Sequence, residues 1–177
     1  MSIARIAVYI MGMLITQVAL SVPPVEVIDS CKNGVAASAS VTITQVSRPL
    51  SLGDNEPGCL DHYESTVNNF NYGYITCQNK TSLIIKGNRI SLSTAENHSV
   101  NPAIIPDGDI LPLSYWWKID FHNSSYLCIN TPLSSSGSGD NILQHYIVEN
   151  AYNNNPTSIY FYFFNKDIIP ISAINNP

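Results

Sequence analysis

Residues 113–130 read LSYWWKIDFHNSSYLCIN, and this stretch decides the fold class. Two runs rich in aromatic and β-branched residues, 113–121 and 126–130, flank the short polar segment His122-Asn123-Ser124-Ser125. Aromatic and β-branched residues favour strands, and a short polar segment between two such runs is typical of a β-hairpin. The stretch therefore predicts two antiparallel strands joined by a tight turn.

The chain repeats this pattern on both sides of the hairpin. Strand-like runs bounded by turn signals lie at residues 40–47, 70–77, 82–86, 89–93, 158–164 and 168–174. Residues 142–149 fit either a strand or a short helix, and no helical periodicity exceeds about two turns. Many short strands in succession predict an all-β fold. We expect an antiparallel β-sandwich, or a barrel-like version of it, with short irregular or helical connections and two disulfides.

The hairpin also carries the first candidate binding residues. Successive residues of a strand face opposite sides, so Trp116, Lys118 and Asp120 share one face and Trp117 lies on the other. The Trp117 face is the more apolar one, and we expect it to pack in the core. Trp116, Lys118 and Asp120 would then form an exposed binding face, since exposed tryptophan is typical of sugar-stacking platforms and of protein hot spots.

The first residues, 1–21, have the layout of a secretory signal peptide. Arg5 precedes the apolar run 6–20 (IAVYIMGMLITQVAL), and small residues, Ala19 and Ser21, occupy the positions that a signal peptidase requires. An uncleaved membrane anchor is the alternative, but a spanning helix needs about 20 apolar residues. The pattern predicts cleavage after Ser21, which leaves residues 22–177 as a single domain.

Four cysteines follow the predicted cleavage point: Cys31, Cys59, Cys77 and Cys128. An even number of cysteines in an exported chain predicts two disulfides, with three possible connectivities. No pair has the close spacing of a zinc site, so neither a metal nor a cofactor is expected. We favour a Cys77–Cys128 bridge, because both residues lie in strongly β-prone segments expected to face a common core. Cys31 and Cys59 would form the second bridge.

Composition excludes some classes of partner. Arg5 belongs to the predicted signal, so the remaining chain carries seven basic and thirteen acidic residues, a formal charge of −6. Nucleic acids and anionic membrane surfaces both need clusters of Lys or Arg, which this chain lacks. We therefore expect a protein or glycan partner, no nucleic acid, and no membrane insertion after signal cleavage. The location would be extracellular, or periplasmic in a Gram-negative bacterium.

Three sequons begin at Asn79, Asn97 and Asn123. In a eukaryotic or virus-encoded secreted protein they predict glycosylation on exposed turns. In a bacterial protein they would carry no such meaning, and the sequence does not name the host.

One arrangement hints at catalysis. Asp120 and His122 lie two residues apart, near Ser124, and a carboxylate can orient an imidazole toward a serine. The glycine-flanked serine of the hydrolase elbow is missing from the sequence, and the four histidines are scattered. We therefore expect a secreted, non-enzymatic binding protein: a pathogen effector or accessory protein acting on a host extracellular or surface partner. A lectin-like or chitin-binding glycan module is the second hypothesis, and an extracellular hydrolase is the third.

Overall fold

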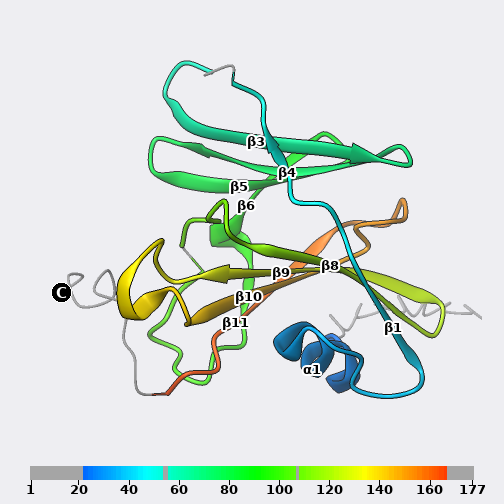
Figure 1. Ribbon diagram of the computed structural model, residues 1–177. Coiled ribbons are helices and arrows are strands. Elements are labelled where there is room, and N and C mark those ends of the chain that lie inside the picture. Colours follow the sequence, from blue (N-terminus) through cyan, green and yellow to red (C-terminus); the bar gives the residue numbers. More distant parts are fainter. Residues whose placement is uncertain (1–21, 54–55, 107, 167–177) are drawn as a thin grey trace, which may run out of the picture.

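The computed structural model describes residues 22–53, 56–106 and 108–166. The predicted signal peptide and the predicted last strand, 168–174, lie outside the described residues. Within the described residues, two β-sheets pack face to face, and one helix covers the far side of one sheet. The result is three layers, which Figure 1 shows in the order sheet, sheet, helix.

The upper sheet in Figure 1 follows the chain without a crossover, and we call it the meander sheet. It contains β2 (Leu50–Ser51), β3 (Cys59–Val67), β4 (Phe70–Cys77), β5 (Lys80–Ile85) and β6 (Asn88–Ser91), all antiparallel. The three hairpins from β3 to β6 turn through Asn68-Asn69, Gln78-Asn79 and Lys86-Gly87. Both residues of each turn have positive φ, which suits the right-handed twist of the strands that they join.

The second sheet combines distant segments of the chain, and we call it the composite sheet. Its order is β1 (Val41–Gln45), β8 (Tyr115–Phe121), β9 (Ser124–Pro132), β10 (Leu143–Glu149), β11 (Ser158–Tyr162) and β7 (Glu96–Asn97). All pairs are antiparallel except β7 with β11. Two 3₁₀ turns, η1 (Leu92–Thr94) and η2 (Gly137–Gly139), lie in the connections.

The predicted all-β fold is confirmed, and because neither sheet closes, it is a sandwich rather than a barrel. The hairpin that opened the sequence analysis is β8–β9, with Phe121 opposite Ser124 across the turn. Residues 142–149 form a strand, β10, rather than a helix. Thus the segments with the strongest local signals adopt the structure that those signals predict.

The helix α1 (Val25–Asn33) was not expected from the sequence. Its buried residues, Val27, Ser30 and Cys31, have helical spacing and pack toward β8, β9 and β10. The helix ends at Gly34, whose φ of +67° allows its N–H to donate to the Ser30 carbonyl at 2.9 Å. α1 is short because it follows Pro24 directly and stops at this glycine.

The helix gives the composite sheet two buried faces. The inter-sheet core contains Trp116, whose ring has no exposed surface, while Trp117 packs partly buried against the helix-side core. Strand alternation is therefore as predicted, but the assignment of Trp116 to an exposed face is wrong. The prediction assumed that one face of this sheet is open to solvent, but both faces are covered. Lys118 and Asp120 share the face of Trp116 and stay partly accessible because they lie farther along β8.

All four cysteines form disulfides, as predicted, but the predicted pairing is wrong. The bridges are Cys31–Cys128, which joins α1 to β9, and Cys59–Cys77, which joins opposite residues of β3 and β4. Cys77 lies on the outer face of the meander sheet and Cys128 on the helix side of the composite sheet. The inter-sheet core separates these two, so no Cys77–Cys128 bridge can form.

Candidate binding cleft

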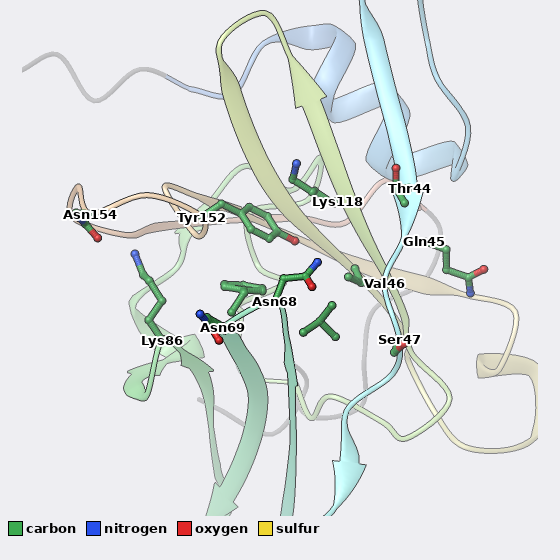
Figure 2. A pocket seen from close by; sticks show the side chains of 12 residues that line it. Thr44, Gln45, Val46, Ser47, Asn68, Asn69, Lys86, Lys118, Tyr152 and Asn154 are labelled. Carbon is green, nitrogen blue, oxygen red and sulfur yellow. The ribbon is translucent and has the colours of Figure 1, made fainter.

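A cleft of about 630 Å³ lies at one end of the sandwich (Figure 2). Five segments form it: the end of β1, the β3–β4 turn, the β5–β6 turn, β8 and the β10–β11 loop. The twelve lining residues are Thr44, Gln45, Val46, Ser47, Val67, Asn68, Asn69, Phe70, Lys86, Lys118, Tyr152 and Asn154. A volume of this size is typical of small-ligand sites.

A row of aromatic rings connects the cleft with the core. Tyr152 lies 4.3 Å from Phe70, Phe70 lies 5.2 Å from Tyr72, and Tyr72 lies 5.7 Å from Trp116, measured between ring centroids. The Trp116 indole N–H donates to Ser114 Oγ at 3.0 Å, which fixes the inner end of the row. The apolar floor of the cleft is therefore supported from within by packed rings.

Lys86 occupies the first position of the β5–β6 turn, with a φ of +52°. Its ammonium donates to two backbone carbonyls of the β10–β11 loop, those of Asn150 at 3.2 Å and of Asn153. These contacts hold the charge at the edge of the cleft and tie two of its walls together. They involve neutral groups, so they use two of the three N–H donors without compensating the charge.

Lys118 lies on β8 and has a different environment. Its ammonium contacts both carboxylate oxygens of Asp120, at 2.7 and 2.9 Å, and lies 5.4 Å from the centre of the Tyr152 ring. Burial would raise the pKa of Asp120, but the hydrogen bonds from Lys118 and Ser125 and the charge of Lys118 outweigh burial and lower that pKa. Asp120 stays ionised, so the charge of Lys118 is largely compensated.

Tyr152 carries a polar atom that the fold leaves unused. Its hydroxyl oxygen is buried and has no hydrogen-bond partner among the described residues. Burial, followed by the influence of Tyr72 and Asp120, raises the pKa of this phenol, so it stays protonated and can donate a hydrogen bond. In Figure 2 the ring reaches from the β10–β11 loop toward the middle of the lining residues.

The structure separates the three residues predicted as one binding face. Lys118 lines the cleft, Asp120 acts beside it as the partner of Lys118, and Trp116 is enclosed in the core behind it. A ring with no exposed surface cannot stack on a ligand, so Trp116 is not a contact residue. Sequence reasoning missed Lys86 and Tyr152, which come from segments far from β8 in the chain.

The residues of the hydrolase hypothesis do not converge. Asp120 bonds to Lys118 and Ser125, and among the described residues no hydrogen bond joins it to His122. The strand ends at Phe121, and His122 lies exposed in the turn with a φ of +50°. The Asp120 carboxylate therefore supports the cleft lysine instead of orienting an imidazole.

The three sequons occupy different settings. Asn79 and Asn123 lie exposed at the tips of the β4–β5 and β8–β9 turns. Asn97 lies in β7, and its amide nitrogen donates to the Ile104 carbonyl at 2.7 Å. Asn97 is exposed too, but its amide nitrogen is engaged in this hydrogen bond. Glycosylation at these three residues stays a prediction.

Over the described ranges, no helix is both long and apolar enough to cross a membrane, and no group of three metal-ligating side chains is close enough to hold an ion. Comparison with protein-family models, with curated proteins and with solved structures gave no match. The fold defines a disulfide-bonded β-sandwich, and its function has to be inferred from the cleft.

Proposed function

We propose that this chain is an exported, non-enzymatic binding protein and that it holds its partner in the cleft. The observation that carries the proposal is the lining itself: an aromatic and aliphatic floor with amides, hydroxyls and lysines around it. Sites that bind ligands combine a mostly apolar surface with a few polar groups that fix orientation. None of the twelve described lining residues is a histidine, cysteine, aspartate or glutamate. The lining does include lysines, hydroxyls and Tyr152, but among the described residues no hydrogen bond joins these side chains to one another as a base and a nucleophile would be joined.

Export belongs to the same proposal. Two disulfides are compatible with an oxidising, extracellular compartment, and residues 1–21 resemble a signal peptide. In this setting the partner is an extracellular or surface molecule, and the form that we favour is an effector or accessory protein acting on a host. Mass spectrometry of secreted protein should find Val22 as the first residue.

The test is a binding assay on arrays of extracellular protein domains and of glycans. Tyr152→Ala removes the ring at the centre of the cleft, and Tyr115→Ala removes an exposed ring from β8 outside the cleft. We expect wild type and Tyr115→Ala to bind the same ligand, and Tyr152→Ala to bind it at least tenfold more weakly. Equal binding by both variants would contradict a role for the cleft. Turnover of ester or glycoside substrates that depends on His122 would contradict the non-enzymatic assignment.

A further inference from the structure

The charge of the cleft is opposite to that of the protein. The chain after the predicted signal has a formal charge of −6, yet two of its seven basic residues line the cleft, Lys86 and Lys118. None of the twelve described lining residues is acidic. A locally positive cleft on an acidic protein attracts anionic ligands while the rest of the surface repels them.

The two lysines supply one free positive charge, not two. Lys118 is compensated by Asp120, whereas the hydrogen-bond partners of Lys86 among the described residues are two neutral carbonyls. Lys86 retains one N–H donor, and its other contacts already hold it in place, so little entropy is lost when an anion binds. A single fixed charge with one free donor suits a monoanion better than a dianionic phosphate.

The remaining groups recognise hydroxyls and a ring face. Besides Tyr152, six lining residues carry neutral amide or hydroxyl groups: Thr44, Gln45, Ser47, Asn68, Asn69 and Asn154. The Tyr152 hydroxyl adds a buried donor without a partner among the described residues. Tyr152 and Phe70 give the cleft an aromatic floor. A sugar ring has this combination of many hydroxyls and one apolar face.

We infer that the cleft binds a sugar residue carrying a single negative charge, either a carboxylate or a sulfate ester, within a glycan of the partner. Lys86 Nζ contacts the anionic group, the Tyr152 ring packs on the apolar face of the sugar, and the asparagines of the β3–β4 turn bond to its hydroxyls. This inference rests on the proposed function, because it assigns a ligand class to the same cleft.

Three probes with one scaffold test it: lactose, 3′-sialyllactose and lactose 3′-sulfate. Affinities are measured by calorimetry with the full chain expressed in secretory cells and treated with endoglycosidase, at low and at physiological salt. We expect at least one anionic probe to bind about tenfold or more tightly than lactose, because one hydrogen bond between charged groups raises the affinity by about this factor. The two anionic arms distinguish carboxylate from sulfate.

Lys86→Gln and Lys80→Gln form a matched pair, since Lys80 lies exposed beside the β4–β5 turn and outside the cleft. Lys86→Gln should abolish the preference for the anionic probes, and Lys80→Gln should keep it. Tyr152→Phe removes only the hydroxyl. It should lower the affinity for each probe that binds, and by a similar factor for each. This variant keeps the floor intact, so it tests the cleft even if Lys86→Gln loosens the loop.

Equal affinity for lactose and both anionic probes, or an anionic preference that survives Lys86→Gln, would overturn the inference. A peptide with a free C-terminal carboxylate that outcompetes the sugars would overturn it too, in favour of a polypeptide ligand. If array binding depends on Tyr152 but ignores all three sugars, the binding function stands and the sugar assignment fails. If array binding does not depend on Tyr152, both fail.

Discussion

The two sheets of the sandwich are assembled in different ways. The meander sheet is built from neighbouring strands joined by short connections, and its disulfide spans 18 residues. The composite sheet pairs β1 with β8 and β7 with β11, and its disulfide spans 97 residues. Local contacts close short loops, whereas distant contacts must overcome a larger loss of chain entropy before they stabilise anything.

This difference shows where the molecule depends on long-range order. The meander sheet depends on turn chemistry, and the composite sheet depends on packing from both sides and on the Cys31–Cys128 bridge to α1. The cleft lies where the two sheets meet and takes residues from both. Its geometry therefore requires the composite sheet to be correctly assembled.

Removing the long-range disulfide should have the largest effect. In the chain-entropy model, Cys31→Ala with Cys128→Ala costs about 4.7 kcal/mol in the free energy of unfolding, and Cys59→Ala with Cys77→Ala costs about 3.2 kcal/mol. Urea unfolding of both double variants measures the difference. A larger loss for the Cys59–Cys77 pair would show that the meander sheet, and not the composite sheet, is the fragile part.

The adjacent tryptophans test the two faces of the composite sheet. Trp116→Ala removes a fully buried ring from the contact between the sheets and should cost about 3–5 kcal/mol. Trp117→Ala removes a partly buried ring on the helix side, beside Gly34, and should cost about half as much. The readout is the free energy of unfolding from denaturant titrations. A greater loss for Trp117→Ala would place the main core under the helix.

Local signals predicted strands in both sheets. They located β4, β5 and β6 of the meander sheet and β1, β8, β9 and β11 of the composite sheet, because turn residues such as Gly87 and neighbouring β-prone runs act within a few positions. They missed β3 of the meander sheet. The disulfide pairing and the faces of Trp116 and Trp117 depend on which distant segments cover each sheet. The helix α1 covers one face of the composite sheet and so decides what surrounds Trp117 and Cys128. Pro24 and Gly34 are local signals for its start and its end, but a helix of nine residues gives only a weak hydrophobic periodicity.

The cleft was harder still to predict. Lys118 was identified because it follows Trp116 on a recognisable strand, whereas Lys86 and Tyr152 come from a turn and a loop. Nothing local to Lys86 shows that its ammonium meets the carbonyls of residues more than sixty positions later. Sites assembled from several loops are defined by tertiary structure and not by sequence pattern.

Acid should weaken the composite sheet selectively. His145 on β10 is buried, and its Nδ1 lies 2.9 Å from Asn130 Oδ1, while the Asn130 amide donates to the Cys31 carbonyl of α1. Burial, aided by the charge of Lys32, lowers the pKa of His145 to about 4 from its ordinary 6.5. The unfolded chain therefore binds a proton between these two values that the folded chain does not.

His145 thus contributes stability that is fully present above pH 6.5 and is lost as the pH falls toward 4, about 3 kcal/mol in total. His145→Gln keeps a hydrogen-bond donor without the titration, so its free energy of unfolding should fall less steeply over this range. Parallel pH profiles for wild type and His145→Gln would show that His145 does not couple the sheet to acid.

The smallest effects are expected in the turns of the meander sheet. Gly87 has a φ of +76° with open space around it, so Gly87→Ala adds only backbone strain, about 1 kcal/mol. Gln78 has a φ of +51° in the β4–β5 turn, which precedes the turn that contains Gly87, and Gln78→Gly relieves strain of the same kind. That relief is partly offset by the added freedom of glycine in the unfolded chain, which leaves a gain of about 0.5 kcal/mol. Thermal unfolding should therefore shift down for Gly87→Ala and up for Gln78→Gly. Shifts of the same sign would mean that turn conformation does not limit this sheet, and the distinction between a turn-dependent and a packing-dependent sheet would be lost.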